Sequence, residues 1–291
     1  MSATYLERLA ARSAATGTVL CLGIDPDPDG LPAEFPRSLA GIERFARLLV
    51  DAAGPYAAAV KPNLAFFEAY GSAGMAALER IRAAIPSDLP VVADAKRGDI
   101  GSTAARQAAA LYDVLGADAI TVNPYLGEEA VLPLLDRSDK FAYVLCRTSN
   151  PGAGELQGLL VRELGAPDAD AVPLYVHMAR RAATWGPGGT VGLVVGATAP
   201  AELAAIRAIA PGLAFLVPGV GAQGGEVEPV LASGPATAAP AGGRPGGGLL
   251  VNVSRGIARA AATPGTGPVG DPAERLAAAA ADWARMLPVL P

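Results

Sequence analysis

The sequence predicts a TIM (β/α)8 barrel formed by one domain, residues 1–291, and three observations lead to this prediction. Hydrophobic residues make up 51% of the 291 positions, and the mean hydropathy is +0.33, which excludes a disordered chain. Short apolar runs alternate eight times with longer amphipathic stretches, as expected for repeated β/α units. No Gly-x-Gly-x-x-Gly follows the first apolar run, which disfavours a doubly wound dinucleotide-binding sheet.

The eight apolar runs are continuous stretches of Val, Ile, Leu and Ala. Such runs are typical of parallel strands that are covered on both faces, because neither face then needs polar residues. The predicted strands comprise residues 17–24, 56–60, 90–93, 117–122, 141–146, 191–195, 214–217 and 248–251.

Amphipathic segments separate these strands and predict the helices of the barrel. They comprise residues 41–53, 72–84, 102–115, 127–135, 169–184, 200–209 and 224–231. An extra N-terminal helix is expected over residues 5–13. A C-terminal helix is expected to begin after Asp271, with Pro272 and Glu274 in its first turn, and to end near Met286.

Two stretches are longer than a compact barrel needs. Residues 150–170 follow the fifth predicted strand. Residues 233–248 are rich in Gly, Pro and Ala and have no apolar period, so we predict a flexible surface loop there rather than a linker between domains.

Composition excludes several classes of function. A net charge of −5 and a pI near 5.0 argue against nucleic-acid binding and against a polybasic membrane protein. No apolar run reaches the roughly 18 residues of a membrane span, and the N-terminus has no apolar signal core. We therefore expect a cytoplasmic protein.

The cysteine and histidine counts limit the chemistry further. Cys21 and Cys146 each lie in an apolar run, which predicts buried, reduced thiols rather than a disulfide scaffold. His177 is the single histidine and falls in a helical stretch. A zinc site with several histidines is therefore excluded, and a Ser-His-Asp triad is disfavoured.

Lysine is rare in this chain, and two of its three lysines lie in polar motifs. The 23 basic residues include only Lys61, Lys96 and Lys140, so arginine meets the routine need for positive charge. Lysine can release a proton in an accessible range, whereas arginine effectively cannot. A lysine that is retained in a polar motif therefore indicates proton chemistry.

The loops after the seventh and eighth predicted strands indicate a phosphate site, which is where this fold commonly binds phosphate. The first loop, PGVGAQGG, combines glycines with Gln223, and glycines let backbone amides approach an anion. The second loop contains Ser254, Arg255 and Gly256 at the start of a helix, where free amides favour negative charge. The alternative is that these glycines only make tight turns.

The third predicted strand ends in the motif that carries the chemistry. Asp94 and Lys96 are two residues apart, so in an extended chain both side chains point to the same side, with Lys61 from the neighbouring strand beside them. An ordinary structural ion pair is the alternative, but a buried pair seldom improves stability over apolar packing. Asp99 lies beyond the strand, and could charge the start of the next helix or reach a neighbouring subunit.

These motifs resemble the orotidine 5′-phosphate decarboxylase family. The likeness rests on Asp94-x-Lys96-x-x-Asp99-Ile100-x-x-Thr103 together with Gly23-Ile24-Asp25, Lys61 and Gln223, and it covers the chain from CLGIDPDP to NVSRGI. The element TSNPG and the chain length resemble the longer bacterial branch, type 2. A single motif of this kind is shared with related barrels, whereas the combination is specific.

The resemblance implies a role for each of these residues. Lys61, Asp94, Lys96 and Asp99 would form an alternating charged array around the reacting carbon, and Asp99 and Thr103 would come from the partner subunit of a homodimer. The residues that would bind substrate are Asp25 on the ribose, with Lys61, then Ser149 on the pyrimidine, and Gln223, Arg255 and Gly256 on the phosphate.

The implied reaction is the decarboxylation of orotidine 5′-monophosphate to uridine 5′-monophosphate, the last step of UMP biosynthesis, without a metal or an organic cofactor. Lys96 would stabilise the carbanion and protonate it. Two alternatives stay open at this point. A related sugar-phosphate decarboxylase or aldolase would use Mg²⁺ and would want an acidic ligand where this chain has Lys61. A phosphate-ligand sensor would bind without turnover.

Overall fold

The computed structural model describes residues 3–163, 165–262 and 271–290. Its centre is a parallel sheet of eight strands in the order β2-β1-β10-β9-β8-β5-β4-β3. Isolated parallel bridges join Val60 to Val91 and Asn63 to Asp94, which brings β2 beside β3 and closes the sheet. The prediction of a TIM barrel is therefore confirmed.

The barrel strands are β1 (Leu20–Ile24), β2 (Ala59–Pro62), β3 (Val92–Arg97), β4 (Ala119–Val122), β5 (Phe141–Arg147), β8 (Val191–Val195), β9 (Ala214–Pro218) and β10 (Leu249–Val253). Both faces of most strands are buried, which explains why their sequences are continuously apolar. One apolar cluster fills the inside of the barrel, and a second lies between the sheet and the helices.

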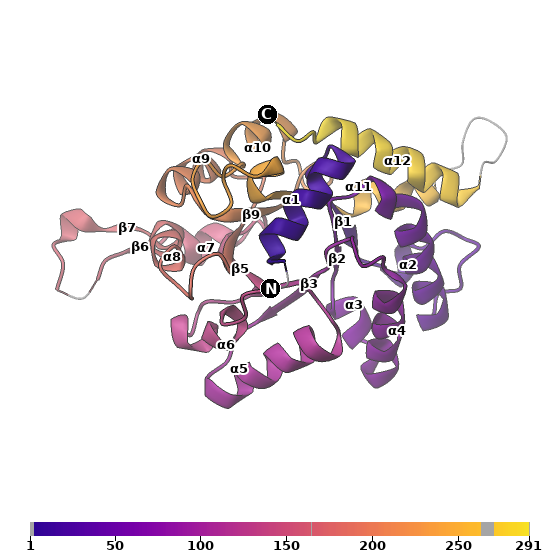
Figure 1. The fold of residues 1–291 in the computed structure, drawn as a ribbon, viewed down its shortest axis with the longest axis horizontal. Coiled ribbons are helices and arrows are strands. Elements are labelled where there is room, and N and C mark those ends of the chain that lie inside the picture. The colour runs from indigo at the N-terminus through magenta and orange to yellow at the C-terminus, as the bar shows by residue number, and fades with distance from the viewer. Residues whose placement is uncertain (1–2, 164, 263–270, 291) are drawn as a thin grey trace.

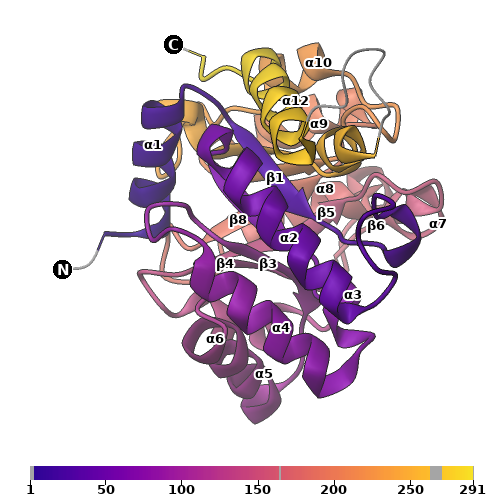
Figure 2. The ribbon, with the colours of Figure 1, turned by 90° about the vertical axis from the view of Figure 1, so that its right-hand side faces the viewer.

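Helices surround the barrel, as Figures 1 and 2 show. They are α1 (Tyr5–Thr16), α2 (Leu39–Ala53), α3 (Ala65–Glu68), α4 (Gly71–Ala84), α5 (Gly101–Ala108), α6 (Leu132–Leu135), α7 (Ala153–Gln157), α8 (Leu174–Ala182), α9 (Pro200–Ile209), α10 (Val227–Ser233), α11 (Arg255–Ala258) and α12 (Pro272–Met286). The prediction for α12 is confirmed, because the Asp271 side chain accepts a hydrogen bond from the amide of Ala273. None of the helices in the described part of the chain is both long and apolar enough to cross a membrane.

The predicted helix over residues 102–115 is only partly α-helical. It begins as α5 and continues as a π-helix over Ala109–Val114. The predicted helix over residues 127–135 is also divided, into a 3₁₀ turn, Glu128–Ala130, and the four-residue α6.

The N-terminal helix α1 covers the amino end of the barrel and lies across the middle of Figure 1. Its Tyr5 enters the barrel, stacks on Phe141 with the ring centroids 4.8 Å apart, and shares a hydrogen bond of 3.1 Å with the hydroxyl of Tyr143. Arg8 forms an ion pair with the buried Asp118 at 2.5 Å. The extra helix therefore acts as a plug for the barrel.

The prediction of a surface loop over residues 233–248 is confirmed only in part: residues 237–239 are exposed, but much of the stretch packs against the barrel. Ala236, Ala241 and the glycines of a 3₁₀ turn, Pro245–Gly248, are buried. Arg207 holds the stretch from α9: its guanidinium donates to the carbonyl of Gly234 at 2.5 Å and lies 3.5 Å above the ring of Phe215. The segment has no apolar period because it packs through the backbone of its glycines and prolines and through small alanines rather than through large apolar side chains.

The second long stretch contains structure of its own. Residues 150–173 form α7, a short antiparallel pair of strands, β6 (Leu160–Val161) and β7 (Val172–Pro173), and a 3₁₀ turn, Asp168–Asp170. The helix predicted over residues 169–184 therefore begins later, at Leu174, and contains His177 as expected. The pair β6 and β7 projects away from the barrel at the left of Figure 1.

Candidate active site

A cavity of about 640 Å³ opens at the carboxyl ends of the barrel strands. Because parallel strands all end at this side of a barrel, side chains that are distant in sequence meet there. The lining includes the predicted site residues Asp25, Lys61, Asp94, Lys96, Ser149, Gln223 and Arg255, and also Asn63, Thr121, Thr148, Asn150 and Asn252.

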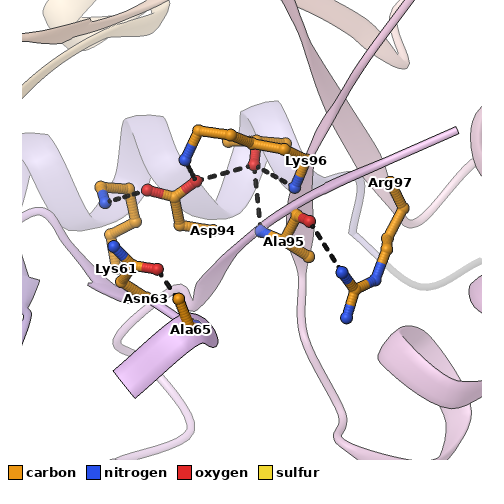
Figure 3. Close-up of polar contacts among 8 residues, drawn as sticks. Lys61, Asn63, Ala65, Asp94, Ala95, Lys96 and Arg97 are labelled. Carbon is orange, nitrogen blue, oxygen red and sulfur yellow. Dashed lines mark hydrogen bonds and ion pairs between the residues drawn. The ribbon is translucent and has the colours of Figure 1, made fainter. Parts of the chain in front are cut away.

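The centre of the cavity is a cluster of three charged side chains, shown in Figure 3. Lys61 Nζ lies 2.7 Å from Asp94 Oδ2, and Lys96 Nζ lies 2.6 Å from Asp94 Oδ1. The Lys61 and Asp94 side chains are only 5% and 11% exposed, whereas that of Lys96 is 51% exposed. The prediction that Asp94 and Lys96 point to the same side is confirmed, and Lys96 is the cation with access to a ligand.

The electrostatics of the cluster keep the buried pair ionised. Burial alone would raise the pKa of Asp94, but Lys61 and Lys96 hold this pKa well below its usual range. Burial would likewise lower the pKa of Lys61, but Asp94 and Asp25 hold it above its usual range. The site therefore keeps a carboxylate and an ammonium side by side at neutral pH.

The backbone at Lys96 differs from the expected extended strand. Its φ is +47°, a left-handed conformation that side chains rarely adopt, and the register between β3 and β4 shifts between Ala93 and Arg97. The strand also runs on to Arg97, four residues further than predicted. This irregular strand end lets the ammonium of Lys96 return to Asp94.

The predicted phosphate residues lie together at one end of the site. Gln223, Arg255 and Gly256 line a recess of about 60 Å³, to which Asp25 and Ser254 also contribute. Gly256 lies in the first turn of the short helix α11 (Arg255–Ala258), as expected.

The C-terminal helix α12 supports both loops of the predicted phosphate site through Trp283. A Cβ atom on Gly221 would lie 3.0 Å from the Trp283 ring, and one on Gly256 would lie 3.0 Å from Trp283 Nε1. A larger residue at either place would press on the indole and displace it by a few tenths of an ångström, and at Gly221 the φ of +71° favours glycine as well.

Three polar atoms of the site are buried without a hydrogen-bond partner among the described residues. They are Asp25 Oδ1, Asn252 Oδ1 and Ser254 Oγ. Buried polar atoms are nearly always hydrogen-bonded in folded proteins, so these three are suited to the polar groups of a ligand.

The loop after β5 carries Ser149 and is held by a residue that the sequence did not reveal. Gln157 of α7 accepts a hydrogen bond from the Thr148 amide at 2.9 Å and donates one to Thr148 Oγ1 at 2.7 Å. Thr148 Oγ1 in turn donates to Asn150 Oδ1 at 2.6 Å. The long stretch after β5 therefore supports one wall of the cavity.

Asp99 and Thr103 do not line the cavity of their own chain. Asp99 accepts a hydrogen bond from the Ile100 amide at 2.8 Å, next to the exposed side chain of Ile100, and Thr103 lies exposed in the first turn of α5. Within one chain, the charged array therefore contains three of its four predicted members.

A closed parallel barrel with a charged cavity at the carboxyl ends of its strands defines an enzyme of the TIM-barrel class. The model of the "Orotidine 5′-phosphate decarboxylase / HUMPS family" matches residues 18–266. The chain belongs to this family, which confirms the resemblance seen in its motifs.

Individual proteins agree with the family assignment. The chain is 47% identical over 256 residues to the orotidine 5′-phosphate decarboxylase of Thermomicrobium roseum, which covers 87% of this chain and 86% of the relative. The solved OMP decarboxylase of Leishmania donovani is 38% identical with a TM-score of 0.79, and the match covers 97% of each chain. The UMP synthase of the same organism is 40% identical with a TM-score of 0.81; the match covers 98% of this chain and 56% of that one.

Proposed function

We propose that this protein decarboxylates orotidine 5′-monophosphate to uridine 5′-monophosphate, the last step of UMP biosynthesis. The observation that carries the proposal is the cluster of Lys61, Asp94 and Lys96 in the cavity, with the phosphate recess beside it. Membership of the decarboxylase family and the names of the relatives support the same reaction.

In this reaction the bond between C6 and the carboxylate carbon breaks, CO₂ leaves, and the electron pair remains on C6. The pair lies in the ring plane, where delocalisation helps little, so the protein must stabilise it by charge. The exposed ammonium of Lys96 faces the cavity and can lie against the developing anion. Lys96 then transfers a proton from Nζ to C6, which completes the product.

The remaining residues bind and orient the substrate. Asp25 and Lys61 are assigned to the ribose and Ser149 to the pyrimidine. Gln223, Arg255 and Gly256 are assigned to the phosphate, because their recess combines an arginine fork with the start of a helix. Electrostatic preorganisation has to lower the barrier by on the order of 20 kcal/mol. Binding of the phosphate, far from C6, helps by closing the Gln223 loop and excluding water.

The direct test mixes the purified protein with orotidine 5′-monophosphate and follows its ultraviolet absorbance. We expect the spectrum of the substrate to convert to that of uridine 5′-monophosphate, and the rate to be unaffected by a chelator. A folded protein that binds the nucleotide without a spectral change would be a sensor rather than a decarboxylase. Loss of turnover in the chelator would favour the Mg²⁺-dependent alternative.

The second part of the proposal is a homodimer in which Asp99 and Thr103 complete the site of the partner subunit. Both residues lie outside the cavity of their own chain. Ile100, shortly after β3, is 58% exposed, and Tyr125, shortly after β4, is 78% exposed. Aromatic side chains are enriched in protein interfaces, and Ile100 lies between Asp99 and Thr103 in the sequence, so these exposed residues support the proposal.

Subunit mixing tests this arrangement. Lys96→Ala and Asp99→Ala proteins are each expected to be inactive, and a mixed dimer has one site with both residues intact. We therefore expect partial recovery of activity after subunit exchange. No recovery, with exchange demonstrated by differently tagged subunits, would contradict the crossing of Asp99.

The cytoplasmic location stays a prediction from the sequence.

A further inference from the structure

Thr121, a residue of β4, joins the strand end that carries Lys96 to the carboxylate of Asp94. Its side chain lies among the barrel strands and is only 2% exposed as a residue. Its Oγ1 accepts hydrogen bonds from the amides of Ala95 at 3.1 Å and Lys96 at 3.0 Å. The same hydroxyl donates to Asp94 Oδ1 at 2.9 Å.

These three contacts fix the direction of the hydroxyl proton. A hydroxyl has two acceptor lone pairs and one proton. Both lone pairs are occupied by backbone N–H groups, so the proton is free to point only at Asp94. The oxygen that accepts this hydrogen bond, Asp94 Oδ1, also accepts the one from Lys96 Nζ.

The contact to the Lys96 amide matters because the backbone there is strained. A φ of +47° is unfavourable for a side chain other than glycine and persists only where the surroundings hold it. Thr121 anchors both amides on the N-terminal side of this bend, one of them the amide of Lys96 itself. The hydroxyl therefore connects the conformation of the strand end with the orientation of the carboxylate.

We propose that Thr121 is a positioning residue for the decarboxylation: its hydroxyl orients the Asp94 carboxylate and fixes the backbone bend that places the Lys96 ammonium beside the reacting carbon. This inference rests on the proposed function. The alternative is that Thr121 merely satisfies two buried amides, in which case its loss would affect folding and binding alike and would not act selectively on the chemistry at C6.

The test compares three variants at positions of equal burial. Thr121→Val keeps the shape of the side chain and removes the hydroxyl, whereas Thr121→Ser keeps the hydroxyl. Thr190→Val is the matched control, because Thr190 is also 2% exposed but its Oγ1 is buried without a partner among the described residues, at the amino end of β8. Each variant is assayed for kcat, KM, melting temperature, and affinity for two ligands: uridine 5′-monophosphate and an analogue with a negative charge at C6.

We expect Thr121→Val to lower kcat about 10- to 100-fold and to lower the affinity for the C6-anion analogue by a similar factor. KM and the affinity for the product should stay within about 3-fold of the wild type. Thr121→Ser should keep kcat within about 5-fold, and Thr190→Val within about 2-fold. A kcat of Thr121→Val within 2-fold of the wild type, or an equal loss of affinity for both ligands, would overturn the proposal.

If Thr121→Val does not fold, Thr121→Cys provides the same measurement, because a thiol fills the site but is a weak donor and acceptor. We then expect kcat to fall at least 5-fold, and an unchanged kcat would overturn the proposal. Turnover by the wild type is measured first, so a failure of the proposed function is seen before any variant is compared.

Discussion

The two ends of the barrel each bury a carboxylate against basic side chains, but they treat it differently. At the amino end, Asp118 pairs with Arg8 and accepts a hydrogen bond from the Val91 amide at 2.8 Å, under the cover of α1. At the carboxyl end, Asp94 pairs with two lysines and Thr121 in an open cavity.

The difference shows how to distinguish a structural ion pair from a reactive one. The amino end uses arginine, which keeps its proton, and α1 covers the pair. The carboxyl end uses lysine, exposes Lys96, and leaves polar atoms of Asp25, Asn252 and Ser254 without partners in the described chain. Buried polar atoms without a partner, together with an exposed lysine, indicate a ligand-binding site.

The largest effect is expected when Lys96 is changed to alanine. In the proposed mechanism this change removes both the cation beside C6 and the transferable proton, so kcat should fall by about 10⁴-fold or more. Affinity for uridine 5′-monophosphate should change little, because the phosphate and ribose contacts remain. The measurement is single-turnover kinetics with a parallel binding assay. A rate near that of the wild type would contradict the role of Lys96 as the proton donor.

Asp118→Ala should affect stability and leave catalysis intact. It removes the partner of Arg8 and leaves the buried Val91 amide without an acceptor, so the free energy of unfolding should fall by about 3 kcal/mol. Urea unfolding measures this loss, and kcat at a temperature where the variant is folded should stay within about 2-fold of the wild type. A larger loss of kcat would mean that the two ends are coupled.

Gln157→Ala should have a smaller effect, confined to the wall of the cavity. Without the Gln157 side chain, the Thr148 amide loses its acceptor and the loop with Ser149 loosens. We expect KM to rise about 5- to 10-fold with kcat nearly unchanged. Leu156→Ala, on the same short helix but with a 48% exposed residue, is the control and should behave as the wild type.

The smallest effect is expected from pH. The folded-state pKa of Asp94 is lowered, so the stability it contributes is present above the unfolded carboxyl pKa of about 3.9 and is lost as the pH falls further. The folded-state pKa of Lys61 is raised, so its contribution is present below its unfolded pKa of about 10.4. The stability difference between the wild type and Asp94→Asn should therefore be constant from about pH 5 to 9. A slope in this window, measured by urea unfolding, would show that one of the pair titrates there.

Regular elements of the barrel could be predicted closely from the sequence because local periodicity determines them. The strand Val191–Val195 and the helix Pro200–Ile209 have the predicted bounds. The breaks in regularity were missed: the end of β3, the π-helix, and the hairpin of β6 and β7. These depend on contacts with distant residues, such as the one between Thr121 and the Lys96 amide, which no local pattern encodes.

The charged and glycine-rich parts of the site could be predicted because their residue types are unusual in apolar surroundings. The role of Thr121 could not be predicted, because it lies inside an apolar strand, where a threonine is common. The role of Gln157 could not be predicted either, because Thr148 becomes its neighbour only after the chain has folded back through α7. Asn252 follows an apolar run much as Asp25 does, so its place at a strand end could be predicted, although nothing in the sequence assigns its side chain to the site.

The position of Trp283 provides the protein with an internal optical reporter. The indole touches both loops of the phosphate recess, whereas Trp185, the other tryptophan of the chain, is buried just before β8 at the opposite end of the barrel. Fluorescence emission from Trp283 should shift when the recess is filled, over a constant background from Trp185. Nucleotide occupancy can thus be followed in real time on the unlabelled enzyme.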